Sequence, residues 1–272
     1  MLQPGPVGLI RALQIASETA QAALLARMDA DDVALPARFA RQIDWLHQHG
    51  LAACGTRIKY FPEEDVRAGA LAYQAWLNAW TTPQDIARDI FVECPIAHPT
   101  LMIRREAFDQ VGGYRDADWP EDYDLVLRLW AAGHTLGNVP EILLKWRERP
   151  DRLSRVDLRY STDGFARCKA HYLARTMLVA RQPIVWGAGP VGKAMVRALE
   201  NEGVAVTAFI DIDPKKIGQR PYGIPVRSPD TLANPTNEFV LAAVGSADAR
   251  ARTRNYLEQI GLVELEDYCA VA

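Results

Sequence analysis

Ala26-Arg27-Met28-Asp29-Ala30-Asp31-Asp32 is the stretch around which the first part of this 272-residue chain is organised. It ends a short apolar run over 22–28, a pattern typical of a buried strand that leaves a sheet edge in charged residues. Three carboxylates then follow, at Asp29, Asp31 and Asp32. Hard divalent cations such as Mg²⁺ and Mn²⁺ prefer carboxylate oxygens. The turn is therefore either a metal site or an acidic turn that caps the next helix.

Helical and strand patterns alternate on both sides of this turn. Upstream, Leu9, Ile10, Leu13 and Ala16 recur near helical spacing. Downstream, Pro36 and Gly50 are typical of the start and stop of a helix. The elements expected after it are strands over 51–60, 100–103 and 139–146, one or two helices over 62–93 broken near Pro83, and helices over 105–111, 121–132 and 161–180.

The composition excludes several classes of protein. The chain is 49% hydrophobic and 24% charged with a net charge of -3, which is typical of a soluble globular protein and excludes a basic nucleic-acid-binding domain. Its four cysteines include no CxxC pair, as in proteins of a reducing compartment. No apolar run has a membrane helix's length, and no signal peptide is visible. We expect a cytoplasmic protein, with association at the inner face of the membrane left open.

A different pattern begins at Arg181-Gln182-Pro183. A short apolar strand leads into Gly187-x-Gly189-x-x-Gly192, a helix follows, and the next strand ends at Asp211. Further strand and helix patterns lie over 239–244 and 249–260. This alternation predicts a doubly wound parallel sheet. Such glycines allow a pyrophosphate to approach the helix N-terminus, and such an acid accepts hydrogen bonds from a ribose. We expect two α/β domains, over residues 1–180 and 181–272.

The ordered motifs of the first domain resemble those of family 2 glycosyltransferases of the GT-A fold, over about residues 5–155. The resemblance rests on the acidic stretch and on five later motifs: Leu35-Pro36-x-Arg38-Phe39-x-x-Gln42, residues 95–105 with His98, Gly112-Gly113-Tyr114-Arg115, Glu121-Asp122-Tyr123-Asp124-Leu125 and Arg128-Leu129. It implies a nucleotide-sugar donor, a divalent metal and, in most members, inversion at the anomeric carbon.

The resemblance also implies roles for single residues. Asp31 would bind Mn²⁺ or Mg²⁺, and Asp29 would lie by the donor ribose and near the metal, with Asp32 behind them. Asp122 would be the catalytic base, with Glu121 the less suited of the pair. His98 would contact the donor or the acceptor, or simply pack. The plain alternative for Glu121 and Asp122 is favourable charge at a helix N-terminus.

Two departures from the family pattern stand out. Nothing before Leu9 resembles the family's segments for the nucleobase and ribose. A complete domain would have roughly 70 more residues upstream, so we expect an N-terminally incomplete GT-A domain whose open sheet edge favours a homodimer. In addition, Arg149 stands where many members have a histidine. An arginine cannot ligate a metal, but it can hold a diphosphate.

The second domain is similar to small Rossmann-like domains of polysaccharide-biosynthesis proteins. The resemblance rests on Gly187, Gly189, Gly192 and Asp211 and on the runs 211–218, 223–226 and 243–246. The ligand would be NAD or another nucleotide or nucleotide sugar, or the domain is purely structural. A Tyr-x-x-x-Lys dyad is not evident, which argues against an NAD-dependent oxidoreductase.

The sequence thus favours metal-dependent sugar transfer from a nucleotide-sugar donor to a glycan or lipid-linked acceptor in cell-surface polysaccharide biosynthesis. The alternative is a non-catalytic nucleotide-binding or regulatory protein with a degenerate transferase half. No nucleic-acid partner is expected.

Overall fold

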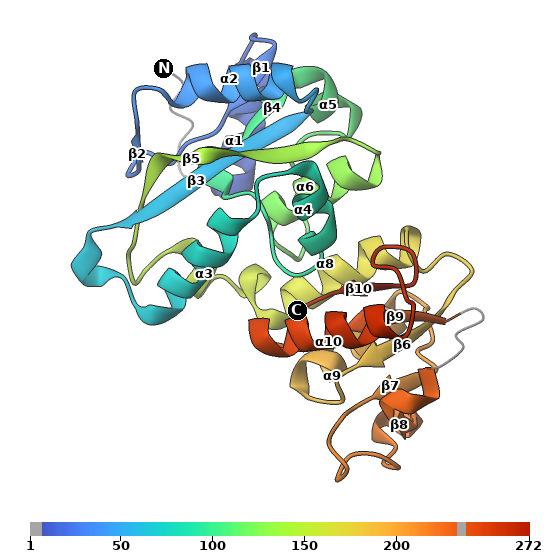
Figure 1. The fold of residues 1–272 in the computed structure, drawn as a ribbon. Helices are drawn as coiled ribbons and strands as arrows, with labels where there is room; N and C mark the ends of the chain where they lie inside the picture. Colours follow the sequence, from blue (N-terminus) through green and yellow to red (C-terminus); the bar gives the residue numbers. More distant parts are fainter. Residues whose placement is uncertain (1–6, 233–237) are drawn as a thin grey trace. The chain divides into compact units, whose positions relative to one another are not determined.

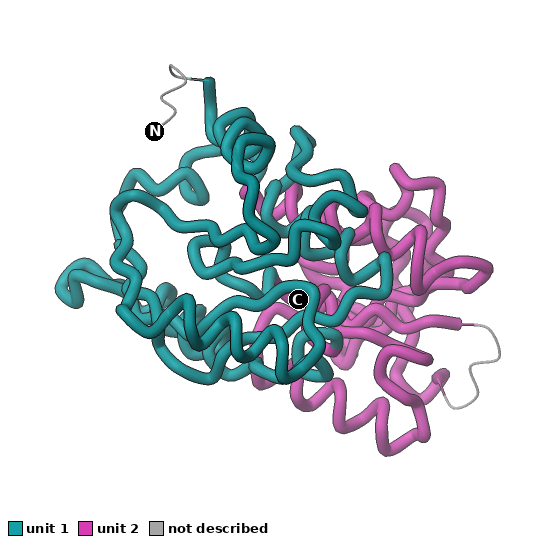
Figure 2. Tube along the Cα trace, turned by 90° about the horizontal axis from the view of Figure 1, so that it is seen from above, with its two compact units in different colours: residues 1–87, 94–159 teal, residues 88–93, 160–272 magenta. Residues whose placement is uncertain are grey.

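The computed structural model describes residues 7–232 and 238–272 and divides into two compact units. Unit 1 comprises residues 1–87 and 94–159, and unit 2 comprises residues 88–93 and 160–272, as Figure 2 shows in two colours. Helix α8 (Thr162–Arg175), which the sequence analysis grouped with the first domain, lies in unit 2. The change of sequence pattern at residue 181 therefore follows the first long helix of unit 2.

Unit 1 is built on a mixed five-stranded sheet in the order β1-β4-β3-β5-β2 (Figure 1). The strands are β1 (Leu24–Ala26), β2 (Val33–Ala34), β3 (Ala53–Phe61), β4 (Met102–Arg104) and β5 (Leu136–Arg147). Strands β3 and β5 run parallel, and the other pairs are antiparallel. The first four residues of β3 are all buried, as expected of a central strand covered on both faces. Strands β1 and β2 form the two edges of this sheet.

The helices of unit 1 include α1 (Leu9–Thr19), α2 (Arg38–Gln48), α3 (Ala68–Ala79), α5 (Arg105–Gln110), α6 (Glu121–Ala131) and the short α7 (Leu153–Val156). Helix α6 is buried over most of its length because Leu125, Val126, Leu127 and Leu129 cover nearly its whole circumference. Its buried polar residues are paired: the Arg128 guanidinium lies 2.7 Å from an Asp124 carboxylate oxygen. Helix α4 (Pro83–Asp89) begins in unit 1, and its last residues belong to unit 2.

Unit 2 contains a five-stranded sheet in the order β10-β9-β6-β7-β8, and every strand pair in it is parallel. The strands are β6 (Gln182–Trp186), β7 (Ala208–Ile210), β8 (Val226–Arg227), β9 (Glu238–Ala242) and β10 (Tyr268–Ala270), and α8, α9 (Pro190–Asn201) and α10 (Ala247–Gln259) are its helices. The chain starts in the middle at β6, runs outward to β8, and returns to β9 on the other side of β6. The predicted doubly wound parallel sheet is confirmed.

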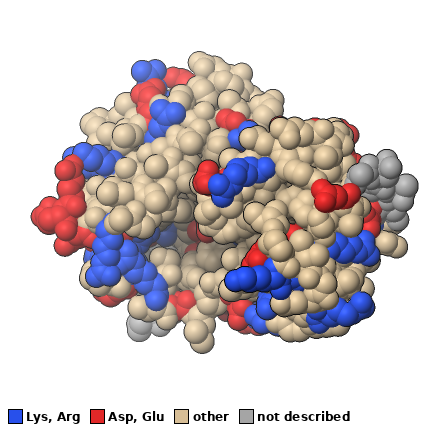
Figure 3. All heavy atoms as spheres, turned by 60° about the horizontal axis from the view of Figure 1, so that its bottom comes forward, with Lys and Arg blue, Asp and Glu red and all other residues tan. Residues whose placement is uncertain are grey.

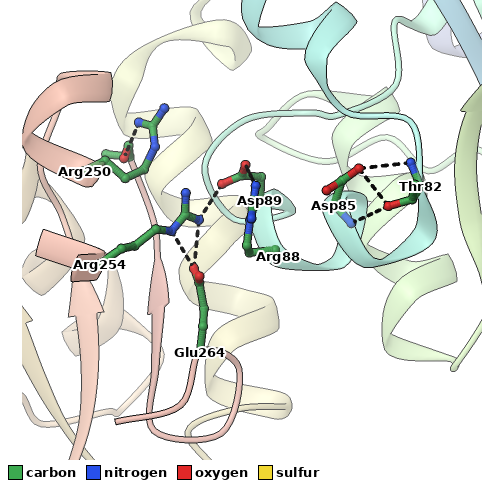
Figure 4. A network of polar contacts seen from close by, with 8 residues as sticks. Thr82, Asp85, Arg88, Asp89, Arg250, Arg254 and Glu264 are labelled. Carbon is green, nitrogen blue, oxygen red and sulfur yellow. Dashed lines mark hydrogen bonds and ion pairs between the residues drawn. The ribbon is translucent and has the colours of Figure 1, made fainter. Parts of the chain in front are cut away.

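Residues 88–93 are held inside unit 2 although the chain on both sides of them belongs to unit 1. Figure 4 shows Arg254 reaching Asp89, whose side chain is fully buried, at 2.6 Å, and Glu264 at 2.8 Å. Buried Lys169 donates hydrogen bonds to the carbonyl oxygens of Val92 and Val271, at 2.8 and 2.9 Å. The segment is therefore fixed by charged contacts that are shielded from water.

Basic and acidic side chains are interspersed on the face drawn in Figure 3. This agrees with the small net charge of -3. Among the described residues, the helices are all too short or too polar to cross a membrane.

Candidate functional site

The acidic turn over 29–32 follows β1 and is anchored by buried polar side chains of α2. The Arg38 guanidinium, which is 1% exposed, donates a 2.7 Å hydrogen bond to the Arg27 carbonyl oxygen. Burial lowers the pKa of Arg38 to about 10, so it stays a cation at neutral pH. The Gln42 amide donates to the carbonyl oxygens of Thr100 and Cys54 at 2.8 and 3.2 Å. Arg38 thus fixes the backbone just before the turn, and Gln42 connects α2 to β3 and to Thr100.

The three acids of the turn have different surroundings. Asp29 forms an ion pair with Arg27 at 2.6 Å, and its side chain is 37% exposed. Asp31 lies 3.2 Å from Arg149, and its side chain is 35% exposed. Asp32 is only 7% exposed and accepts a 2.8 Å hydrogen bond from the Arg147 N–H. Asp29 and Asp31 are therefore the two acids that a ligand can reach.

Burial, opposed by the hydrogen bond from Arg147 and assisted by the charges of Asp29 and Asp31, raises the pKa of Asp32 to about 6. Its second oxygen, Oδ2, has no hydrogen-bond partner among the described residues. Asp32 is thus the most buried of the three acids.

The end of β5 closes over this turn. Strand β2 pairs with β5, Ala34 opposite Leu144. Beyond that pairing, Arg147 Nε donates to the Asp31 carbonyl oxygen at 2.8 Å, and Arg149 reaches the Asp31 carboxylate. The side chains of Arg147 and Arg149 thus add two positive charges beside the acids, next to that of Arg27. An arginine beside a carboxylate can hold a phosphate group when a metal takes over the carboxylate.

The acidic turn offers two of the ligands that a divalent cation needs, but not a complete set. Within residues 7–232 and 238–272, no group of three or more His, Cys, Asp or Glu side chains is arranged to hold a metal. Asp29 and Asp31 nevertheless offer two half-exposed carboxylates on one turn. Mg²⁺ and Mn²⁺ commonly take one or two carboxylates and complete their shell with phosphate oxygens and water. The donor set therefore fits a metal that binds together with a diphosphate.

A second cluster joins His98 to the first turn of α6. The turn over His98–Thr100 is fixed against β3, because the Thr56 N–H donates to Thr100 Oγ1 at 3.2 Å. His98 Nε2 lies 2.9 Å from the Tyr114 hydroxyl, and His98 Nδ1 lies 3.5 Å from a Glu121 carboxylate oxygen. Burial, assisted by the charge of Arg27, holds the pKa of His98 well below its usual range. His98 is therefore neutral at pH 7.

The acids of α6 differ in accessibility. Glu121 is 1% exposed and faces His98, whereas Asp122 is only partly buried. An Asp122 oxygen accepts a 2.7 Å hydrogen bond from the following N–H, that of Tyr123. Of the two acids, Asp122 is the one better placed to meet a substrate hydroxyl.

Electrostatics links the acidic turn to α6. Burial raises the pKa of the Tyr114 hydroxyl, the charges of Asp122 and Glu121 raise it further, and Arg27 opposes them. Arg27 therefore acts on the same tyrosine as the α6 acids while it pairs with Asp29. No role was predicted for Arg27 or Tyr114 from the sequence. Only their position inside the quoted motifs indicated that they belong to the site.

The glycine-rich turn of unit 2 lies between β6 and α9. Gly187 has a φ of 114°, and a Cβ there would lie 2.7 Å from the Ala243 carbonyl oxygen. A Cβ at Gly192 would lie 1.8 Å from the Gly187 carbonyl oxygen. Gly189 has an ordinary φ of -88°, and a Cβ there would meet nothing within 4 Å. The chain's own packing therefore requires glycine at Gly187 and Gly192 but not at Gly189.

Asp211, at the end of β7, points back at this turn. Its Oδ2 accepts hydrogen bonds from the Ala188 N–H and from Lys216 Nζ, both at 2.9 Å, and its Oδ1 accepts from the Asp213 N–H at 2.9 Å. Although burial alone would raise the pKa of Asp211, these hydrogen bonds lower it below the usual value. Both oxygens predicted for a ribose are thus already engaged by the chain.

A cavity of about 490 Å³ opens at the carboxyl ends of β6, β7 and β9. This is the place where the strand order reverses, which is where doubly wound sheets bind ligands. Its lining includes Gly187, Gly189, Asp211, Lys216, Val244 and Arg252.

Comparison with known proteins gives a family match in the first part of the chain. Residues 2–112 match the model of glycosyl transferase family 2. The chain is 28% identical over 187 residues to the amylovoran biosynthesis glycosyltransferase AmsE of Erwinia amylovora, which covers 63% of this chain and 68% of AmsE. It is 31% identical over 138 residues to the O-antigen biosynthesis glycosyltransferase WbnJ of Escherichia coli, which covers 50% of this chain and 52% of WbnJ. The aligned part is thus only about half the length of WbnJ.

Among solved structures, the mannosyltransferase PcManGT of Pyrobaculum calidifontis, in complex with GDP-Man and Mn²⁺, is 18% identical, with a TM-score of 0.39. The match covers 71% of this chain and 48% of that one. A likeness of this degree carries no inference about ligands.

Proposed function

We propose that this chain is a family 2 glycosyltransferase that transfers a sugar from a donor to an acceptor. The match of residues 2–112 to that family supports the proposal. The donor is a nucleotide sugar, the acceptor is a glycan or lipid-linked glycan, and the setting is bacterial polysaccharide biosynthesis. The similarity to AmsE, a glycosyltransferase of amylovoran biosynthesis, and to WbnJ, a glycosyltransferase of O-antigen biosynthesis, supports that setting. The observation that carries the proposal is the pair of half-exposed acids, Asp29 and Asp31, with Arg149 beside them.

The acidic turn binds the donor diphosphate. Asp31, assisted by Asp29, would hold Mn²⁺ or Mg²⁺, and the metal, when bound, neutralises negative charge that develops on the leaving diphosphate. Arg149 is 51% exposed and now pairs with Asp31. With its Asp31 partner engaged as a metal ligand, Arg149 would be available to bind a phosphate oxygen. Asp32 stays in the interior and holds the Arg147 backbone N–H, which fixes the end of β5 against the turn.

Asp122 receives the proton of the acceptor. As the acceptor oxygen bonds to the anomeric carbon, the bond from that carbon to the diphosphate breaks, the electron pair leaves with the diphosphate, and the hydroxyl proton passes to the Asp122 carboxylate. Attack from the face opposite the diphosphate inverts the anomeric centre. His98 stays neutral and, with Glu121, keeps the first turn of α6 in place.

Two measurements test the proposal. Calorimetric titration with a panel of UDP- and GDP-sugars, in Mn²⁺ and in EDTA, should show binding of at least one donor only with the metal. Release of nucleoside diphosphate is then followed with that donor and a mixture of short glycans. Asp122→Asn should slow release by a factor of about 10² to 10⁴ without weakening donor binding. Asp109→Asn is the matched control, because Asp109 is an exposed acid of α5. The proposal fails if no donor binds in a metal-dependent way, or if both variants behave alike.

A further inference from the structure

The glycine at position 189 lacks an explanation in the chain itself. A side chain there would point into open space, and the backbone conformation suits any residue. Gly189 nevertheless lines the 490 Å³ cavity, next to the N-terminus of α9. Open space beside a backbone at a cavity wall is what a ligand needs in order to approach the main chain closely. This observation indicates a ligand at the turn.

The electrostatics of the cavity favours an anion. Helix α9 is 12 residues long and directs its positive end toward the turn. Its first residue, Pro190, has no N–H, and the N–H groups of Val191 and Gly192 have no acceptor within the helix. Lys216 adds an ammonium group, of which Asp211 engages one hydrogen at 2.9 Å. The lysine side chain is 37% exposed, so its remaining donors face solvent.

The acid that would select a dinucleotide already has three of its roughly four acceptor sites occupied. All three hydrogen bonds to Asp211 come from the chain, and its side chain is 7% exposed. Recognition of ribose hydroxyls at the end of the second strand needs an acid with open acceptor sites. Of the Asp211–Lys216 pair, the Lys216 ammonium is therefore the group left to face a ligand.

The other side of the cavity is apolar. Val244 and Tyr256 line it, and Ile212, which is 70% exposed, lies at its edge. An exposed isoleucine at a cavity edge offers a flat, uncharged group a surface to cover. Arg252 also lines the cavity and forms an exposed ion pair with Asp248 at 3.0 Å. The lining thus combines a cationic part with an apolar part.

We infer that the cavity of unit 2 binds a nucleoside diphosphate, with its phosphates between the glycine-rich turn and Lys216 and its base over the apolar lining near Ile212. This site is separate from the donor site of unit 1 and needs no metal. The site recognises the phosphate charge through Lys216. It does not depend on hydrogen bonds between ribose hydroxyls and Asp211.

Titration calorimetry on the 272-residue chain in EDTA isolates this site, because donor binding at the acidic turn requires the metal. The probes are ADP, UDP and GDP, the three corresponding nucleosides, and NAD⁺. At least one diphosphate should bind, its nucleoside should bind at least tenfold more weakly, and NAD⁺ should bind no more tightly than ADP. Binding should persist in Asp31→Asn, which separates this site from the proposed transferase site.

Three variants locate the ligand. Lys216→Gln should weaken binding of the diphosphate by about tenfold or more, because a charge-assisted hydrogen bond is lost. Lys215→Gln is the matched control, because Lys215 is exposed and is not part of the lining. Gly189→Ala should weaken binding while the melting temperature is retained, which shows that the variant is folded. The inference is overturned if no diphosphate binds in EDTA, if nucleosides bind equally well, or if folded Lys216→Gln and Gly189→Ala both bind like the wild type.

Discussion

The acidic turn of unit 1 and the glycine-rich turn of unit 2 both follow a buried strand, yet they are held in opposite ways. At the acidic turn, the side chains of Arg27, Arg147 and Arg149 surround the acids, and Asp29 and Asp31 remain half-exposed. At the glycine-rich turn, the backbone packs on itself, and the one acid, Asp211, points inward. The first turn presents negative charge, and the second presents N–H groups and a lysine.

This difference teaches how to separate a binding residue from a scaffold residue. An acid whose oxygens keep solvent access can exchange its partners for a ligand. An acid whose oxygens already accept buried hydrogen bonds stabilises the fold, and removing it leaves donors without partners. Substitutions of Asp29 and Asp31 should therefore change ligand binding, and those of Asp211 and Gly192 should change stability.

Among substitutions in the two turns, the largest effect is expected at Asp31. Asp31→Asn should lower metal-dependent sugar transfer by at least about 100-fold, since the neutral amide no longer attracts the cation. Its melting temperature should stay within about 2 °C of the wild type, because the lost ion pair with Arg149 is exposed. Transfer rates in Mn²⁺ and thermal unfolding check both parts. Asp44→Asn, an exposed acid of α2, is the control. Retained activity in Asp31→Asn would contradict the proposal that Asp31 is a metal ligand.

Gly192→Ala should show the opposite behaviour. Its Cβ would lie 1.8 Å from a backbone oxygen, so the turn must open, at a cost on the order of 3 kcal/mol in the free energy of unfolding. Gly189→Ala is the same substitution three residues earlier and meets no atom within 4 Å, so its effect should stay below about 1 kcal/mol. Urea unfolding of both variants measures the contrast. Equal losses would refute the difference in packing.

The dependence of stability on pH sharpens the comparison. The folded pKa of His98 is lowered, so below its unfolded pKa, about 6.5, the unfolded chain binds more protons and stability falls. By pH 5 this costs up to about 2 kcal/mol. The lowered pKa of Asp211 gives stability that is present above about pH 3.8 and lost only in stronger acid.

Denaturant unfolding of the wild type and His98→Gln at pH 7.5 and 5.0 checks this. The variant should lose less stability between the two pH values. A pH dependence that is unchanged in His98→Gln would show that another group is responsible.

The smallest effect is expected at Arg149. Arg149→Gln removes an ion pair that is about half exposed, so the free energy of unfolding should change by less than about 1 kcal/mol. Affinity for the donor in Mn²⁺ should fall by about tenfold, through loss of one charge-assisted contact to phosphate. Isothermal titration with the donor checks this. Unchanged affinity would leave Arg149 as a surface residue only.

Local patterns predicted much of the fold and both turns. The parallel sheet of unit 2, the helix at Glu121 and the strand before the acidic turn all follow from periodicity and from capping residues. Strands β2 and β8 were not predicted, because two residues are too few to show a period. The strand that was predicted to end at Asp211 is only three residues long in the structure, where β7 spans Ala208–Ile210.

Local patterns could not predict which of the acids are buried and which remain exposed. Asp32 is buried because the backbone of Arg147, 115 positions away, donates to it. Asp211 is engaged by Ala188, 23 positions earlier in the chain. The sequence gives the kinds of groups at each turn, but only the assembled sheet decides which of them face the solvent.

The placement of residues 88–93 has a consequence for synthesis of the protein. These residues leave the ribosome before Lys169, Arg254 and Glu264 have been made, and at common translation rates the wait is on the order of ten seconds. During this time Asp89 lacks its partner Arg254, and the Val92 carbonyl lacks Lys169 for the first part of the wait. A product cut short after residue 159 would keep residues 88–93, including the buried apolar pair Ile90 and Phe91, without the groups of unit 2 that hold this segment.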